Sequence, residues 1–119
     1  LLAQLIDANR MREATELYID LTDVDPTVRP GREGDYEPLM NMLVQRREYR
    51  RAVRMANGFH KDFPQSPAIP LLYLEVARIF HEVLDQPARA RQVAEFLLRH
   101  FPKHPAANRA RALRDAVTS

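Results

Sequence analysis

The sequence has no cysteine, only three glycines among 119 residues, and no long uninterrupted apolar run. Without cysteine there is no disulfide framework, no thiolate nucleophile and no cysteine-ligated zinc site. No run approaches the roughly 18 to 20 apolar residues that cross a bilayer, and no charged-then-apolar leader opens the chain. The chain also has no large excess of charge of either sign, because 18 basic and 16 acidic residues leave a net charge of +2. That small imbalance does not indicate nucleic-acid binding.

The composition that is present favours one helical domain. Hydrophobic residues make up 45% of the chain, enough for a core without metal or disulfide support. Nine prolines and little β-branched alternation predict helices separated by proline-marked corners. The chain opens at Leu1 inside an apolar pattern, which indicates a soluble domain, residues 1–119, cut from a larger protein. The sequence does not indicate a cellular compartment. If the parent protein is anchored in a membrane, the domain lies on its cytoplasmic or periplasmic side.

The sequence repeats with a period of 38 residues. Alanine and proline recur in register, at Ala14, Ala52 and Ala90 and at Pro26, Pro64 and Pro102. The apolar residues between them are spaced by three and four, which places them on one helix face. A unit of this size can hold two helices but cannot bury its own apolar stripe, so it stacks on its neighbours.

We expect seven helices, in three hairpins followed by a C-terminal capping helix. They cover residues 1–8, 11–22, 36–46, 48–62, 68–84, 86–100 and 105–117. Side chains suited to accept hydrogen bonds from helix N-termini are Asn9, Asp35, Ser66 and Asp85. Asn57-Gly58 lies inside the predicted helix 48–62, where an interior glycine costs about 1 kcal/mol relative to alanine.

This pattern resembles the tetratricopeptide repeat, an antiparallel helix pair with small residues where its helices touch and a proline after the second helix. The residues that carry the resemblance are Ala52, Ala56, Phe59 and Pro64, then Ala90, Ala94, Leu97 and Pro102, more weakly Ala14, Leu21 and Pro26, and Tyr73, Val76, Ala77 and Phe80 in a first helix. The sequence departs in its period of 38 against 34. Tyr18 and either Leu39 or Met40 also stand where the family has small residues. The resemblance implies an all-α solenoid that recognises proteins on the concave face made by its first helices and is rarely catalytic.

The polar stripes of these first helices are the candidate partner-binding residues. They are Gln4, Asp7, Glu37, Asn41, Gln45, Glu75, Arg78 and Glu82. Within each helix they lie three or four residues apart and so point the same way. The face is acidic and rich in amides, which favours a partner peptide with basic and apolar residues. The alternative is that these are ordinary solvated helix faces.

A second candidate surface is basic. It consists of Arg47, Arg50, Arg51, Arg54 and Lys61, opposite the apolar residues of the same helix. Such a surface could meet phosphates or anionic lipid headgroups. We favour a solubilising outer surface instead, since no aromatic platform accompanies the arginines and acidic residues alternate with them.

No motif of catalysis, metal binding or cofactor binding stands out. His100 and His104 are four residues apart, but Pro102 interrupts the helix that would direct both to one metal ion. No nucleophile elbow, phosphate loop or dinucleotide fingerprint is present. We therefore expect a non-enzymatic scaffold without cofactor or small-molecule substrate, which binds a protein or peptide. The alternative is a regulatory or oligomerisation segment that pairs through apolar terminal edges.

Overall fold

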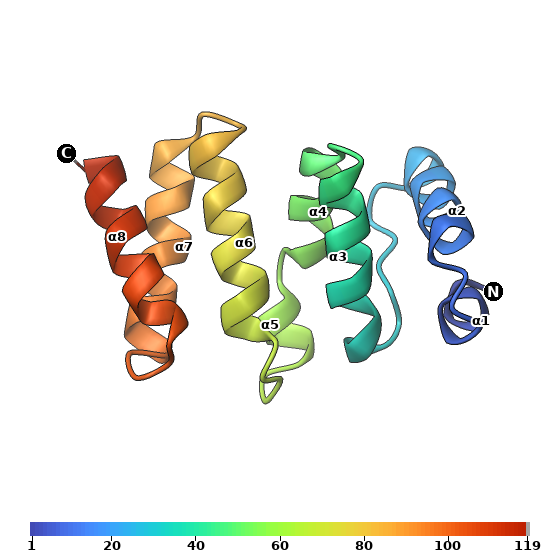
Figure 1. Cartoon of the computed structure of the whole chain (residues 1–119), viewed down its shortest axis with the longest axis horizontal. Helices are drawn as coiled ribbons and strands as arrows, with labels where there is room; N and C mark the ends of the chain where they lie inside the picture. The colour runs from blue at the N-terminus through green and yellow to red at the C-terminus, as the bar shows by residue number, and fades with distance from the viewer. Residues whose placement is uncertain (119) are drawn as a thin grey trace. The chain divides into compact units, whose positions relative to one another are not determined.

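The computed structural model describes residues 1–118, and in that range every regular element is helical, with no strand (Figure 1). The predicted all-α class is therefore confirmed. The chain divides into two compact units, unit 1 from Leu1 to Ser66 and unit 2 from Pro67 onwards. None of the helices in the described range is long and apolar enough to cross a membrane.

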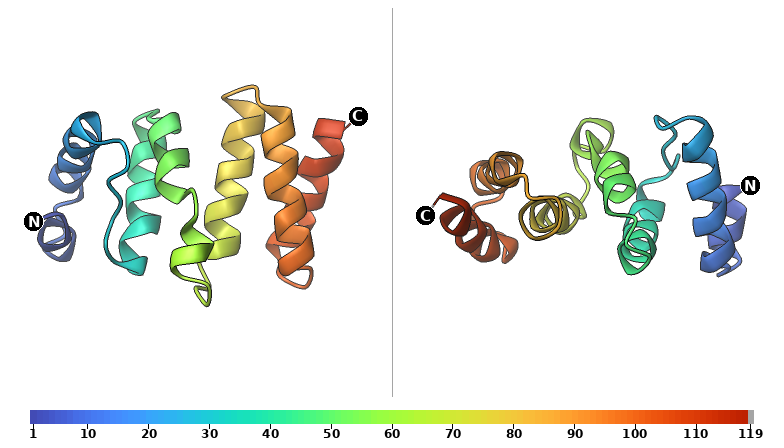
Figure 2. Two further views of the ribbon diagram at one scale, coloured as in Figure 1. Left: turned by 180° about the vertical axis from the view of Figure 1, so that it is seen from behind. Right: turned by 90° about the horizontal axis from the view of Figure 1, so that it is seen from above.

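Unit 1 contains α1 (Leu2–Asp7), α2 (Met11–Val24), the short 3-10 helix η1 (Glu33–Asp35), α3 (Tyr36–Gln45), α4 (Tyr49–Ala56) and α5 (Phe59–Asp62). In sequence order, α1 packs on α2, α2 on α3, and α3 on α4 (Figure 2). The alanines of the repeat pattern, Ala14, Ala52 and Ala56, are fully buried in this unit. Their small side chains let the helices approach closely.

Unit 2 contains α6 (Ile69–Glu82), α7 (Pro87–His100) and α8 (Ala106–Thr118). The first two form an antiparallel hairpin, and α8 packs against both of them (Figures 1 and 2). Ala77 of α6, Ala90 and Ala94 of α7, and Ala110 of α8 are fully buried. The matched alanines thus lie between helices in this unit as well.

The predicted continuous helix over residues 48–62 is wrong. It is broken after Ala56, where Asn57 is extended and Gly58 adopts a left-handed φ of 81°. A short helix, α5, then begins at Phe59. The break places the rings of Phe59 and Phe63 against Tyr36, at centroid distances of 4.7 and 5.8 Å. This aromatic packing compensates for the backbone hydrogen bonds that a continuous helix would have made.

The predicted side-chain caps are also wrong, because the N-cap side chains of α1 to α7 accept no hydrogen bond from the helix backbone. Asn9 and Asp85 instead adopt left-handed φ values of 59° and 51°, one residue before the N-caps of α2 and α7. Asp35 is at the N-cap of α3, but its carboxylate accepts hydrogen bonds from Arg32. Ser66 precedes the actual N-cap of α6, Ala68, by two residues.

Leu21 departs from the repeat pattern. Its equivalents Phe59 and Leu97 are buried, whereas Leu21 is 39% exposed. The next residue, Thr22, turns inward and donates a hydrogen bond to the Tyr18 carbonyl oxygen at 2.9 Å. In the first copy of the repeat, the polar Thr22 is therefore buried in place of the apolar Leu21.

Candidate functional site

The predicted partner-binding residues of unit 1 do not gather into one site. Gln4 of α1 and the α3 residues Glu37, Asn41 and Gln45 are exposed. Asp7 is also exposed, but its carboxylate accepts hydrogen bonds from Arg32 at 2.9 and 3.1 Å. This hydrogen-bonded ion pair holds the pKa of Asp7 below its ordinary value. Asp7 therefore ties α1 to the loop before α3.

Arg32 is the centre of this connection. Besides Asp7, its guanidinium donates to both carboxylate oxygens of Asp35, at 2.9 and 3.0 Å, and to the Ala3 carbonyl oxygen at 3.3 Å. The bonds to Asp7, followed by those to Asp35, raise the pKa of Arg32 above its ordinary value. The planar fork of arginine suits such multiple acceptors.

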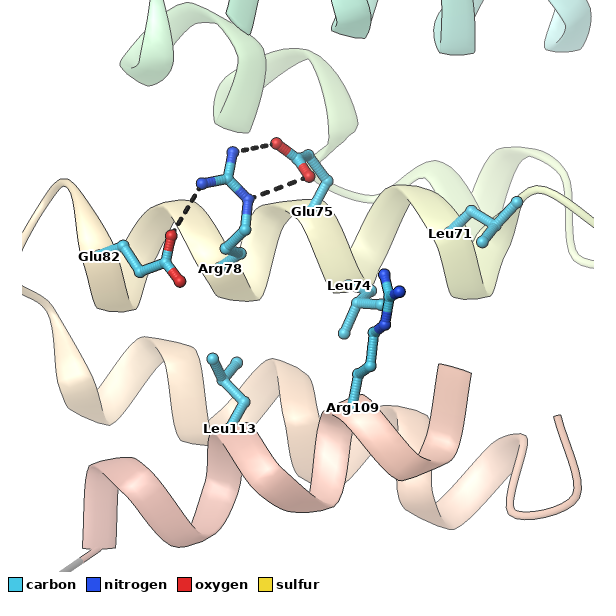
Figure 3. A pocket seen from close by; sticks show the side chains of 7 residues that line it. All are labelled: Leu71, Leu74, Glu75, Arg78, Glu82, Arg109 and Leu113. Carbon is cyan, nitrogen blue, oxygen red and sulfur yellow. Dashed lines mark hydrogen bonds and ion pairs between the residues drawn. The ribbon is translucent and has the colours of Figure 1, made fainter. Parts of the chain in front are cut away.

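In unit 2, the predicted residues Glu75, Arg78 and Glu82 do come together, and we call them the α6 charge cluster. Arg78 donates through Nε and Nη2 to the two oxygens of Glu75, and through Nη1 to Glu82 at 2.9 Å (Figure 3). Both partners, Glu75 before Glu82, raise the pKa of Arg78. The spacing of three and four residues on one helix face makes this arrangement possible. Arg78 thus offsets one of the two negative charges of this cluster.

A groove of about 330 Å³ lies next to this cluster, between α6 and α8. We call it the α6–α8 groove. Its lining residues are Leu71, Leu74, Glu75, Arg78 and Glu82 of α6, and Arg109 and Leu113 of α8 (Figure 3). Leu71 is 52% exposed, and Leu74 and Leu113 are half-buried. The volume is at the lower end of the roughly 300–1,000 Å³ range of ligand pockets. It therefore suits anchoring side chains of a larger partner.

Arg109 is the one cation of the groove lining that has no carboxylate beside it. Within residues 1–118 its side chain makes no hydrogen bond or ion pair, in contrast to Arg78. It extends from α8 toward α6 near Leu74, and Leu113 extends toward α6 one helical turn further on (Figure 3). The groove therefore combines three aliphatic side chains, an ion-paired cluster of two carboxylates with one guanidinium, and the guanidinium of Arg109, which has no ion pair in the described range.

The sequence analysis missed Leu71, Leu74, Arg109 and Leu113 as site residues. A signal was present, because a shift of one 38-residue period carries Leu71 to Arg109 and Glu75 to Leu113. Extension of the repeat register into the last helix would have placed these two residues on the equivalent face.

The predicted basic surface needs one correction. Arg47, Arg50, Arg54 and Lys61 are exposed, but the Arg51 side chain is only 13% exposed and points toward α2. It pairs with Asp23 at 3.0 Å and with Glu48 at 3.3 Å. It also donates to the Thr22 hydroxyl at 2.5 Å. The buried Thr22 hydroxyl and the exposed Asp23 carboxylate at the end of α2 hold Arg51 there, whereas periodicity alone placed it on the outer surface.

The described residues include no group of three or more histidine, aspartate or glutamate side chains arranged to hold a metal ion. His104 accepts a hydrogen bond at Nδ1 from the Ala106 backbone N–H at 3.0 Å, at the start of α8.

Comparisons with protein-family models, with curated proteins and with solved structures find no match for this chain.

Proposed function

We propose that the chain is a non-catalytic protein-interaction module that anchors the apolar side chains of a partner peptide or helix in the α6–α8 groove. The observation that carries this proposal is the groove itself, because Leu71 presents half of its surface to solvent beside Leu74 and Leu113. Burial of this apolar surface by a partner is favourable, at about 25 cal/mol per Å².

We further propose that the helix hairpins follow the tetratricopeptide-like plan, as a scaffold in which first helices present the binding surface. Two facts support this proposal. The groove is lined by α6 and α8, the helices that the 38-residue period places in equivalent positions. The matched alanines of both units are buried. Enzymatic activity, a cofactor and a small-molecule substrate have no part in this function.

The experiment compares a serine substitution on α6 with one at the C-cap residue that follows this helix, by use of a phage-displayed library of random 12-residue peptides. Leu71→Ser removes an exposed apolar side chain from the groove, and Val83→Ser removes one that is 39% exposed outside it. Peptides selected on the unaltered chain are then measured by fluorescence anisotropy. We expect about fivefold weaker binding to Leu71→Ser, since half a leucine's burial is worth about 1 kcal/mol.

Val83→Ser should bind the selected peptides as the unaltered chain does, and circular dichroism should show equal helix content in all three proteins. The proposal is contradicted if no peptide is enriched, or if the enriched peptides bind Leu71→Ser and the unaltered chain equally tightly.

A second candidate function is self-association or regulation through apolar edges of unit 1. Val24 is 89% exposed and Leu21 is 39% exposed, both at the C-terminal end of α2, and Leu1 is 79% exposed. Contiguous exposed apolar residues mark interaction sites when they form a patch of several hundred Å². Sedimentation velocity across concentrations separates the two candidates, because a constant monomer mass contradicts self-association.

A further inference from the structure

We propose that the α6–α8 groove selects partner segments that place an aspartate or glutamate side chain against Arg109, flanked by apolar residues. This inference rests on the proposed function of the same groove and specifies the chemistry of its occupant. It reverses the sequence-based expectation of a basic partner.

The carboxylates of the groove already accept hydrogen bonds from within the chain. Arg78 lies between Glu75 and Glu82 and uses three N–H groups for them. A basic side chain from a partner would have to compete with Arg78 for three of the four carboxylate oxygens, because Arg78 binds both oxygens of Glu75 and one oxygen of Glu82. Arg78 therefore offsets one of the two negative charges, and only the remaining one is available to a basic partner.

Arg109, in contrast to the carboxylates of the groove, has no partner of opposite charge in the described part of the chain. Its guanidinium also makes no hydrogen bond within residues 1–118. Its neighbours on α8 do not supply a partner either, because Asn108 accepts from Arg111 at 2.8 Å and Asp115 pairs with Arg114 at 3.3 Å. Five donors of a permanently charged group are thus available.

The surroundings of the Arg109 guanidinium are partly apolar. Its side chain lies near Leu74, in a groove that also contains Leu71 (Figure 3). A bound apolar segment would exclude water from this end of the groove and so strengthen an ion pair formed there. Guanidinium binds carboxylate through two parallel hydrogen bonds, which also orients the partner. Apolar side chains on either side of the acid would reach Leu71 and Leu113.

The experiment uses the same random peptide library on the whole chain and on two glutamine variants of α8. Arg109→Gln removes the groove cation, and Arg111→Gln removes an exposed arginine that does not line the groove. Peptides selected on the unaltered chain should be enriched in acidic residues next to apolar ones. In a selected peptide, replacement of the acid by its amide should weaken binding about two- to fivefold.

On Arg109→Gln, the acid and amide peptides should bind equally, whereas Arg111→Gln should keep the preference for the acid. If enriched peptides need Leu71 but show no acidic preference, the groove function stands and this inference is overturned. If the acidic preference survives in Arg109→Gln, another cation recognises the acid and the inference is also overturned. If no peptide is enriched at all, the proposed function itself fails.

Discussion

Several arginine side chains of this chain are structural, and Arg51 is the clearest example. Its guanidinium spans Asp23, Glu48 and the Thr22 hydroxyl while only 13% of its side chain is exposed. Sequence spacing placed it among the solvent-facing arginines of the same helix, because periodicity gives the direction of a side chain but not the acceptors on the neighbouring helix. Two of these partners, Thr22 and Asp23, lie 29 and 28 residues earlier in the sequence, on α2.

Arg51→Ala should lower the free energy of unfolding by about 1–3 kcal/mol, since the buried Thr22 hydroxyl and the Ile19 carbonyl oxygen lose a charged donor. Arg50→Ala is the matched control, because the neighbouring Arg50 is exposed. Its effect should stay within about 0.5 kcal/mol. Urea unfolding followed by circular dichroism measures both values. Equal effects of the two substitutions would show that the contacts of Arg51 do not stabilise unit 1.

Tyr18 gives a prediction on alkaline stability. It is buried, and its hydroxyl donates to the Val28 carbonyl oxygen at 3.0 Å. Burial, followed by the nearby Tyr36, raises the pKa of Tyr18 from 10.0 to about 12. A raised pKa means that the folded chain holds this proton more tightly than the unfolded chain. The contribution of the protonated Tyr18 hydroxyl to the free energy of unfolding is therefore complete below pH 10, and it is lost as the pH rises toward 12.

The free energy of unfolding should fall by roughly 2 to 3 kcal/mol between pH 10 and pH 12 because of Tyr18. In Tyr18→Phe this share of the fall should be missing, while stability at pH 7 drops by about 1 kcal/mol from the lost hydrogen bond. Urea titrations at both pH values measure the difference. If both proteins lose stability equally above pH 10, the raised pKa of Tyr18 is contradicted.

Among the helices, α2, α3 and α7 follow the sequence closely. The prediction of residues 86–100 for α7 differs from the observed Pro87–His100 by a single residue, and residues 11–22 correspond to Met11–Val24. The start of α7 is fixed by Pro87, because proline has a restricted φ and no N–H. This effect is local and can be predicted from the sequence. The left-handed residues before α2 and α7 were not predicted, because asparagine and aspartate suit both a cap and a left-handed turn.

The break between α4 and α5 depends on Gly58, whose φ of 81° is costly for any residue with a Cβ atom. Gly58→Ala should destabilise the protein by about 1–2 kcal/mol. The added Cβ would lie 3.3 Å from the flexible end of Arg29, so the cost is mainly conformational. Thermal unfolding followed by circular dichroism measures it.

Gly34→Ala is the matched control, because Gly34 has neither a positive φ nor a heavy atom within 4 Å of the added Cβ. This substitution should be neutral or slightly stabilising. If Gly58→Ala is equally harmless, the chain between α4 and α5 does not depend on the left-handed conformation.

At the scale of the whole molecule, the repeat predicted the helical class and the buried alanines but not the composition of the groove. The three- and four-residue spacing placed Glu75, Arg78 and Glu82 on one face, and the structure brings them together. That Arg78 pairs with both Glu75 and Glu82 depends on its rotamer. That Arg109 and Leu113 complete the groove depends on the packing of α8 against α6, which no local pattern encodes.

The most direct test of the central claim is a methyl NMR titration of the whole chain, labelled at its leucines, with a peptide selected on that chain. If the α6–α8 groove is the partner site, the methyl signals of Leu71, Leu74 and Leu113 should shift together, while those of Leu1, Leu2 and Leu5 in unit 1 stay in place. Binding that moves other leucines and leaves these three unchanged would contradict the assignment of the α6–α8 groove as the partner site.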